Sequence, residues 1–264
     1  NVVYGLVGMK IHAKLCLVVR RENDGVTRYV HIGTGNYNPS TAKIYTDMGI
    51  LTANPDICAD VTDLFNVMTG YAYRDQYREL LVSPHSLRGP LLDLIRNEIA
   101  MHAEHGGGEI IFKCNQLVDK DIIRALYRAS AAGVRVRLQV RGVCCLRPGV
   151  PGVSEHIEVT SVVGRFLEHS RVYWFRNTGE GCLYIGSADL MPRNLDRRVE
   201  VLVPILDPAI RSCIREDILE AHLRDNRQAW RLREDGSYTR LSPAKGEDEV
   251  NAQECMIALR ARHD

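Results

Sequence analysis

Two histidines stand in sequence contexts that match each other. In each copy the histidine is followed by one spacer and a basic residue, then by an apolar run, and after a gap by a second apolar run that ends in Gly-x-x-Asn or Gly-x-x-Asp. The motif residues are His12, Lys14 and Asn36 in the first copy and His169, Arg171 and Asp189 in the second. One His-x-Lys pattern alone indicates little, whereas two copies in parallel contexts favour two half-sites that meet.

These residue types suit the transfer of a phosphoryl group. An imidazole can attack phosphorus and carry the group as a phosphohistidine, and a second imidazole can act as general acid or base near neutral pH. Residues two apart on a strand project from the same face, so we expect Lys14 beside His12 and Arg171 beside His169. The two cations would neutralise the non-bridging phosphate oxygens. Asn36 and its counterpart in the second copy would orient an imidazole or donate a hydrogen bond nearby.

The other histidines and two groups of arginines allow less specific interpretations. His31 lies between apolar residues of a predicted strand and is interpreted as a core histidine. One group is as consistent with structural ion pairs as with an anion site: Arg193, Arg197 and Arg198. A second group occupies alternate positions of a predicted strand, so that one face of it is basic, either as an exposed edge or as a groove for a polyanion: Arg135, Arg137 and Arg141.

Periodicity predicts an α/β chain that places these motifs on strands. The sequence Val82-Ser83-Pro84-His85 suggests a domain boundary. After it, a predicted strand, a helix closed by glycine and a second strand imply parallel βαβ packing. Strands are predicted at 1–7, 13–20, 28–32, 44–52, 109–113, 134–140, 157–163, 172–175, 182–185 and 198–205. Helices are predicted at 56–71, 87–105, 119–132 and 208–223, and residues 243–254 are predicted to be loose.

The composition is that of an ordinary globular domain rather than of a nucleic-acid or membrane protein. Of 264 residues, 45% are hydrophobic and 25% charged, and the net charge is +1, so any polyanion site must be a local cluster and no nucleic-acid partner is expected. The eight cysteines show no metal-binding spacing, which favours reduced thiols and a cytoplasmic location. No apolar run of about 20 residues is present. The chain begins at Asn1 in a strand-like run, and we expect that an N-terminal portion is missing.

The sequence surrounding the two motifs resembles that of a known family. The paired signatures are similar to those of the phospholipase D superfamily, and the surrounding sequence resembles the C-terminal catalytic half of the bacterial class 1 polyphosphate kinases over roughly residues 1–240. The matching segments are Tyr29-Val30-His31-Ile32-Gly33-Thr34-Gly35-Asn36-Tyr37-Asn38-Pro39, Tyr45-Thr46-Asp47-Met48-Gly49, Lys113-Cys114-Asn115-Gln116, Gly164-Arg165-Phe166-Leu167-Glu168-His169-Ser170-Arg171 and Ser187-Ala188-Asp189-Leu190-Met191-Pro192-Arg193-Asn194.

The resemblance implies a fold of two phospholipase D-like α/β domains. Each would have a mixed sheet flanked by helices, and a pseudo-twofold axis would relate the two. The expected ranges are 1–82 for the remainder of the first domain, 83–241 for the second domain and 242–264 for a C-terminal tail.

The resemblance also implies an activity: reversible transfer of the ATP γ-phosphate to inorganic polyphosphate through a phosphohistidine, with release of ADP. By position, His12 matches the phosphorylated histidine, and Tyr45, Arg141 and His169 match nucleotide- and phosphate-contacting residues, with His169 also the acid/base partner. The supporting motif positions are Lys14, Arg171 and Asn36. Residues near the site without an assigned role are Arg165, Arg193 and Arg198. The family requires Mg²⁺, whose ligands we expect in the missing N-terminal part, so no metal ligand is assigned here.

Two other functions stay open. The general phospholipase D pattern has an aspartate five positions after the basic residue, where this chain has Val19 and Arg176, which makes a phosphodiesterase the less favoured alternative. The chain by itself could instead be a non-catalytic module that binds polyphosphate or mediates oligomerisation. From the resemblance we expect a homo-oligomer, and peripheral association with a membrane is left open.

Overall fold

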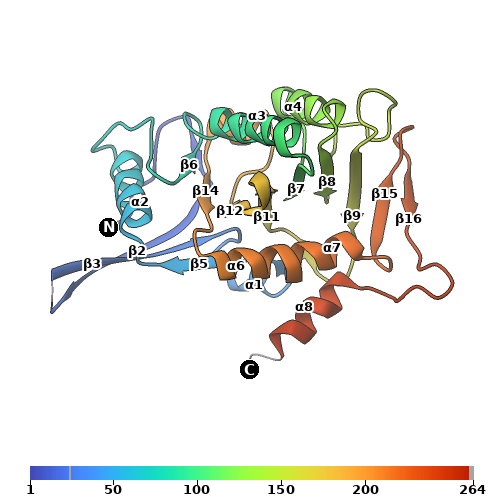
Figure 1. Ribbon diagram of the computed structural model, residues 1–264. Helices are drawn as coiled ribbons and strands as arrows, with labels where there is room; N and C mark the ends of the chain where they lie inside the picture. Colours follow the sequence, from blue (N-terminus) through green and yellow to red (C-terminus); the bar gives the residue numbers. More distant parts are fainter. Residues whose placement is uncertain (24, 262–264) are drawn as a thin grey trace.

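A nine-stranded mixed sheet forms the centre of the second half of the chain (Figure 1). The computed structural model describes residues 1–23 and 25–261. In order across the sheet, the strands are β16 (Tyr238–Arg240), β15 (Ala229–Leu232), β9 (Ile157–Val162), β8 (Arg135–Val140), β7 (Glu109–Cys114), β11 (Arg171–Phe175), β12 (Cys182–Gly186), β14 (Val201–Pro204) and β6 (Leu81–Val82). Strands β7, β8 and β9 are parallel and the other pairs are antiparallel, which confirms the predicted βαβ packing.

Helices cover both faces of this sheet (Figure 1). On one face lie α3 (Arg88–His105) and α4 (Lys120–Ala131), close to their predicted ranges. On the other face lies a continuous helical run of α6 (Pro208–Cys213), the π-helical turn η2 (Ile214–Leu219) and α7 (Glu220–Arg224). The helix predicted at 208–223 is therefore present, with a π-helical segment in its middle.

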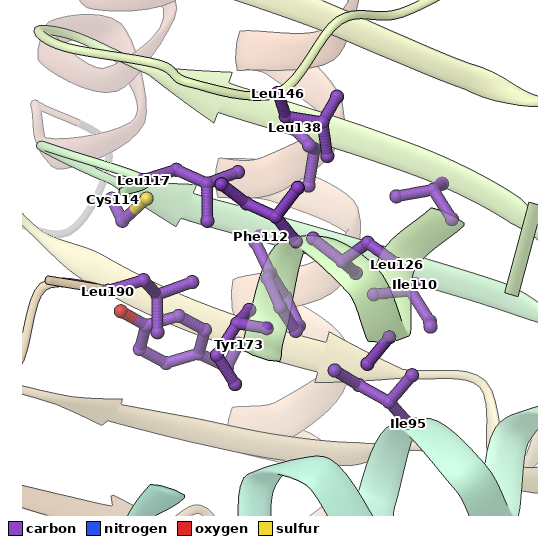
Figure 2. Close-up of a cluster of buried hydrophobic side chains, with 14 of the residues drawn as sticks. Ile95, Ile110, Phe112, Cys114, Leu117, Leu126, Leu138, Leu146, Tyr173 and Leu190 are labelled. Carbon is purple, nitrogen blue, oxygen red and sulfur yellow. The ribbon is translucent and has the colours of Figure 1, made fainter. Parts of the chain in front are cut away.

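The main core lies between the sheet and the helices α3 and α4. Phe112 of β7 packs edge-on against Tyr173 and Phe175 of β11, with ring centroids 5.0 and 5.5 Å apart. Figure 2 shows Phe112 and Tyr173 among the aliphatic side chains of this cluster. Burial of each such side chain stabilises the fold by roughly 1.5–3 kcal/mol, so this layer holds β7 and β11 rigidly side by side.

A smaller antiparallel sheet carries the first histidine motif. Its strands are β2 (Lys14–Glu22), β3 (Gly25–Gly33) and β5 (Gly49–Thr52), and α2 (Pro55–Met68) covers one face. Val30 and Ile32 of β3 are buried against Ile57 and Val61 of α2. The strand predicted at 1–7 was wrong: the first strand begins at Lys10, and Val2, Val3, Tyr4 and Val7 are exposed without a sheet partner among the described residues.

Two short parallel strand pairs join the halves reciprocally. Strand β1 (Lys10–Ile11), which precedes His12, pairs with β13 (Arg198–Val199) of the second half. Strand β10 (Leu167–Glu168), which precedes His169, pairs with β4 (Tyr45–Thr46) of the first half. The single strands predicted at 44–52 and 198–205 are therefore each divided, because their first residues pair with the opposite half and their last residues pair with their own sheet.

The register of these strands shows an internal repeat. Lys14 pairs with Gly33 as Arg171 pairs with Gly186, and Gly33 pairs with Gly49 as Gly186 pairs with Leu202. The predicted mixed α/β architecture is thus confirmed, and the reciprocal pairing is the arrangement that a pseudo-twofold axis between the halves requires. The remaining elements are α1 (Pro39–Ala42), η1 (Asn177–Gly179), α5 (Pro192–Arg197) and α8 (Ala252–Arg260).

Residues 243–254 are anchored to the second half, contrary to the expectation of a loose segment. The Val250 carbonyl accepts a hydrogen bond from the Asn226 amide at 3.1 Å, and the Ala252 amide donates to the Asp225 carboxylate at 2.8 Å. These bonds fix the start of α8. Within residues 1–23 and 25–261, none of the helices combines the length and the apolar character needed to traverse a bilayer.

Candidate active site

Each of the two motif histidines, His12 and His169, is placed by a strand of the opposite half. The amide of His12 donates to the carbonyl oxygen of Val199 at 3.0 Å, directly after the β1–β13 pair. The amide of His169 lies 3.4 Å from the hydroxyl of Thr46, directly after the β10–β4 pair. The backbone of both histidines is therefore fixed by strands that cross between the halves.

The imidazole of His12 is oriented by Glu200. The Nδ1 atom lies 2.8 Å from Oε2 of Glu200, whose side chain is 0% exposed. The other carboxylate oxygen of Glu200 accepts from Asn194 at 2.6 Å. Because a carboxylate oxygen accepts hydrogen bonds, Nδ1 of His12 carries the ring proton, which leaves a lone pair on Nε2.

The imidazole of His169 is oriented in the same way by Asp47. Its Nδ1 lies 2.9 and 3.0 Å from the two Asp47 oxygens, and Thr34 donates to Asp47 at 2.6 Å. Burial lowers the pKa of His169, and Arg171 and Lys14 add to this effect while the hydrogen bond with Asp47 opposes it. A depressed pKa keeps the ring neutral near pH 7, so its Nε2 is available as a proton acceptor.

Lys14 and Arg171 are the buried cations of the site. Burial lowers the pKa of Lys14 to about 8, with a further lowering from Arg171 and opposition from Glu200 and Asp47. Arg171 of the second half lowers the pKa of Lys14, and Asp47, which contacts His169 of the second half, raises it. The two half-sites therefore meet in one electrostatic environment. Lys14 donates to the backbone carbonyl of His12, so the predicted proximity of the two residues holds.

Arg171 is braced by several partners around His169. It forms an ion pair with Asp189 at 3.0 Å, and its Nη1 donates to the carbonyl of His169 at 2.7 Å. The same Nη1 lies 3.2 Å from Nε2 of His169. Arg171 is therefore both a structural anchor and a positive charge next to Nε2 of His169.

Tyr45, Arg141 and Asn36 surround this centre in different ways. The Tyr45 ring lies 4.7 Å from the His169 ring, tilted by 44°, and it lines a cavity of 690 Å³ whose walls are mainly apolar. Arg141 directly follows β8 and donates from Nε to Asn115 at 2.9 Å, and Asn115 in turn donates to the His169 carbonyl at 3.1 Å. Asn36 is exposed and its side chain makes no hydrogen bond to the described residues. Hence Tyr45 contacts the His169 ring, Arg141 is linked to the His169 backbone through Asn115, and Asn36 lies at the surface.

The carboxylates that orient the imidazoles were missed as site residues in the sequence. The carboxylates that contact Nδ1 of the rings are those of Asp47 and Glu200, whereas Asn36 and Asp189 do not contact Nδ1 of either histidine. A signal was nevertheless available: Asp47 lies 11 positions after Asn36, and Glu200 lies 11 positions after Asp189. Equal spacing in both copies would have identified the pair.

Other predicted residues lie apart from the histidines. The interpretation of His31 as a core histidine was wrong: it is half-buried, on the face of β3 away from α2, and lies 2.7 Å from the Tyr37 hydroxyl. The basic face of β8 is neither an exposed edge nor a groove at its centre, because Arg137 is buried and paired with Glu109 and Glu220.

The arginines of uncertain role divide between the two interpretations. Arg198 lies 3.9 Å from Glu200, and Arg193 donates to Gln116 at 3.3 Å, so both stand near the site. Arg165 stacks on Phe166 with its guanidinium carbon 5.1 Å from the ring centroid.

A larger cavity of 890 Å³ lies at the far end of β11, around Trp174 and Arg176, and none of the motif residues lines it.

The described residues do not form a metal site. Within 1–23 and 25–261, no group of three or more His, Cys, Asp or Glu side chains converges as metal ligands do. The site carboxylates are already engaged: Asp47 with His169, Glu200 with His12, and Asp189 with Arg171.

Comparison with known proteins gives a consistent set of relatives. The family described as polyphosphate kinase C-terminal domain 1 matches residues 1–74, and polyphosphate kinase C-terminal domain 2 matches residues 80–253. The polyphosphate kinase of Prosthecochloris aestuarii is 56% identical over 241 residues, which are 91% of this chain and 34% of that protein. Polyphosphate kinase 1 of Chlorobaculum tepidum is 52% identical over 262 residues, which are 99% of this chain and 37% of that protein.

A solved structure shares the fold. The crystal structure of polyphosphate kinase from Porphyromonas gingivalis superimposes with a TM-score of 0.91 at 39% identity, over 98% of this chain and 40% of that one. The chain thus spans about a third of the length of the curated relatives it matches.

Proposed function

Because the chain belongs to the polyphosphate kinase family, we propose that it carries the catalytic histidines of an ATP:polyphosphate phosphotransferase. One observation supports this above the others. Each of two imidazoles is held at Nδ1 by a carboxylate, which leaves a lone pair on each Nε2, and the buried cations Lys14 and Arg171 lie within the same site. A nucleophilic imidazole, a neutral partner imidazole and positive charges are the groups that transfer of a phosphoryl group uses.

In the proposed first step, His12 accepts the phosphoryl group. Its Nε2 attacks the γ-phosphorus in line, the phosphorus–nitrogen bond forms, and the bond to the bridging oxygen of ADP breaks. Glu200 stabilises the positive charge that develops on the His12 ring, because its carboxylate is hydrogen-bonded to Nδ1 and shielded from water.

In the proposed second step, the terminal phosphate oxygen of polyphosphate attacks the phosphohistidine. The phosphorus–nitrogen bond breaks, the chain is lengthened by one phosphate, and His12 is restored. His169 would accept the proton of the incoming phosphate at Nε2, since its lowered pKa keeps it neutral. Lys14, Arg141 and Arg171 would hold and neutralise the phosphate oxygens.

Tyr45 supports nucleotide binding at the same place. Its ring lies 4.7 Å from the His169 ring, so it would stack on or brace a nucleotide whose phosphates reach this histidine. Asn36, which is exposed, would donate to the substrate rather than to an imidazole.

The same proposal covers the binding of Mg²⁺, the release of ADP and the oligomeric state of the whole protein. The described residues offer no carboxylate cluster that fits Mg²⁺, so the ion would be held by the nucleotide phosphates and by residues outside this chain. We further propose that the whole protein is a cytoplasmic homo-oligomer. The eight cysteines, all without a disulfide partner, support a reducing compartment.

The test of the proposal is covalent labelling in the full-length protein. With γ-labelled ATP, the parent protein and a His156→Ala control, which removes an exposed histidine, should both take up label. His12→Ala should take up none. Label retained by His12→Ala on another residue would refute the assignment of the phosphoryl carrier.

Two further assays distinguish the alternative functions. Hydrolysis of a synthetic phosphodiester without nucleotide would favour a phosphodiesterase, the alternative that the paired motifs left open. Polyphosphate synthesis should then be measured for the full-length protein and for this chain in parallel. Synthesis by the former and only polyphosphate binding by the latter would assign the chain alone to a binding module.

A further inference from the structure

A buried carboxylate, Glu168, joins several elements behind His169. Its side chain is 5% exposed, and its Oε2 lies 2.9 Å from Nζ of Lys113 on β7 and 3.1 Å from Nε2 of His222 on α7. Oε2 also accepts from the hydroxyl of Thr46 on β4 at 2.9 Å, and Oε1 accepts from Gln253 on α8 at 2.7 Å. We call these five residues the Glu168 cluster.

The hydrogen bonds fix the charges within the Glu168 cluster. Burial acts to raise the pKa of Glu168, but Lys113 and His222 outweigh it and hold that pKa well below its usual range. Nδ1 of His222 lies 2.8 Å from the carbonyl oxygen of Ile218, an obligate acceptor, while Nε2 faces the ionised Glu168. Both ring nitrogens of His222 therefore face hydrogen-bond acceptors. The carboxylate is thus held between the Lys113 ammonium and the His222 ring.

The Glu168 cluster reaches both neighbours of His169 in the chain. Besides its ion pair with Glu168, Lys113 donates to the hydroxyl of Ser170 at 2.8 Å. The Thr46 hydroxyl accepts a hydrogen bond from the His169 amide at 3.4 Å, and the Thr46 carbonyl accepts one from the Ser170 amide at 2.9 Å. Because successive residues of an extended strand point to opposite sides, the cluster lies behind the strand while the His169 ring projects into the site.

The cluster also sets the partner of the His169 ring. Thr46 directly precedes Asp47, whose carboxylate lies 2.9 Å from Nδ1 of His169. Glu168 therefore holds, through its own backbone and through Thr46, the two chain segments that carry the imidazole and its orienting carboxylate.

Among the residues of the first half that the structure describes, no equivalent of this cluster is present. In the two crossing strand pairs, Glu168 is paired with Thr46, whereas the corresponding pair is apolar: Ile11 with Val199. Ala13 stands where Ser170 stands in the second half. The ionic support is thus confined to the His169 side.

We infer that Glu168, clamped by Lys113 and His222, is a positioning residue for His169 and couples the C-terminal helices α7 and α8 to the site. Its effect is on geometry: it fixes the distance between the His169 ring and Asp47, and it makes no contact with a reacting atom. The functional part of this inference rests on the proposed phosphotransfer, whereas the structural part concerns the His169–Asp47 pair alone.

The test compares three variants of the full-length protein. Glu168→Gln removes the charge that clamps Lys113 and His222. The double variant Glu168→Leu/Lys113→Met removes the Glu168–Lys113 ion pair as a whole, so that neither partner of this pair is left as a buried unpaired charge. Glu158→Gln makes the same exchange as the first variant at an exposed glutamate of β9 and is the control.

We expect a loss in kcat on the order of ten- to a hundred-fold for the first two variants, with KM for ATP nearly unchanged, because a small misplacement of a reacting group has effects of this size. The histidine ring NMR signals of His169 should shift in both, while those of His12 stay in place. The control should match the parent. A folded Glu168→Gln or double variant with parental kcat and unmoved His169 signals would overturn the inference.

The two readouts separate this inference from the proposed function. If the parent protein shows no ATP-dependent transfer but the His169 signals still move in the variants, then the proposed function fails and the positioning stands. If transfer is present and the His169 signals do not respond, then the positioning fails alone.

Discussion

At the scale of single residues, the orienting carboxylates determine which nitrogen of each imidazole is reactive. Glu200 and Asp47 both bind Nδ1, so His12 and His169 both present Nε2. What distinguishes the two rings is their surroundings. His12 is 19% exposed, while His169 is 10% exposed and lies against the guanidinium of Arg171.

Loss of the Glu200 charge should disable His12. In Glu200→Gln an amide nitrogen must face either His12 or Asn194, both of which donate to the native carboxylate. We expect label uptake from γ-labelled ATP to fall about 100-fold or more, as for the loss of a buried carboxylate that fixes a catalytic imidazole. Glu104→Gln, on the exposed side of α3, should label at the parental rate. Parental labelling of a folded Glu200→Gln would contradict the role of Glu200.

The protonation of Lys14 should limit activity at alkaline pH. Its pKa of about 8 means that the ammonium loses its proton as pH rises through 8, and the charge that we propose to neutralise phosphate oxygens is then lost. The rate of transfer should therefore fall on the alkaline side of pH 8. Lys14→Arg keeps the charge to pH values above 12, so the alkaline decline should move upward in a pH–rate profile. An unchanged decline in Lys14→Arg would assign it to another group.

The residues on the histidine strands were predictable and their carboxylate partners were not. Lys14 and Arg171 follow from a spacing of two on a strand, which is local information. Asp47 and Glu200 act on a histidine of the opposite half, and only the crossing strand pairs bring them there. Equal spacing after the Gly-x-x-Asn/Asp signature is the one local sign of their role.

At the scale of elements, the site is built where strands change partners. Each of the two divided strands pairs first with the opposite half and then with its own sheet. The change of partner occurs at Asp47-Met48 in one strand and at Glu200 in the other. Periodicity predicted both segments as strands but could not predict the break, because every residue on either side is suited to extended structure. The break is set by tertiary pairing, and it places a carboxylate at the turn between the two sheets.

Gly186 tests the close packing at this crossing. A methyl group at Gly186 would overlap the carbonyl oxygen of Val201, which is backbone and cannot rotate away. Gly186→Ala should therefore lower the stability by about 2–4 kcal/mol and displace the adjacent Glu200. Its counterpart Gly33→Ala would come closest to the side chain of His31, at 3.1 Å, which is half-buried and can move, and the backbone of Gly35 lies at an ordinary contact distance of 3.7 Å. Thermal unfolding should rank Gly33→Ala as the milder variant, and equal melting temperatures would contradict the packing argument.

At the scale of the whole molecule, the two halves differ in whether the strand that follows the histidine lies inside its sheet or at its edge. Strand β11 lies inside the large sheet between β7 and β12, whereas its counterpart β2 is an edge strand of nine residues among the described elements. Val18 and Val19 of β2 are 49% and 56% exposed. A long apolar edge strand is a site at which another chain can pair.

The isolated chain should therefore self-associate through β2. We expect light scattering after size exclusion to show a mass that rises with protein concentration, and Val18→Lys to reduce this rise because a charge on an edge strand opposes pairing. Val153→Lys, at an exposed loop valine, is the matched control and should behave as the parent. A chain that stays monomeric at all concentrations would contradict the role of this edge.

The reciprocal strand pairs have a consequence for how the two histidines can differ. Were the halves two copies of one shorter polypeptide, every substitution would appear at both sites and the imidazoles would stay identical. Joined in one polypeptide, equivalent positions vary independently: Lys14 against Arg171, Tyr45 against Arg198, Ile11 against Glu168. A symmetric scaffold in a single chain can thus hold two specialised imidazoles, one open to a substrate and one supported from behind by charge.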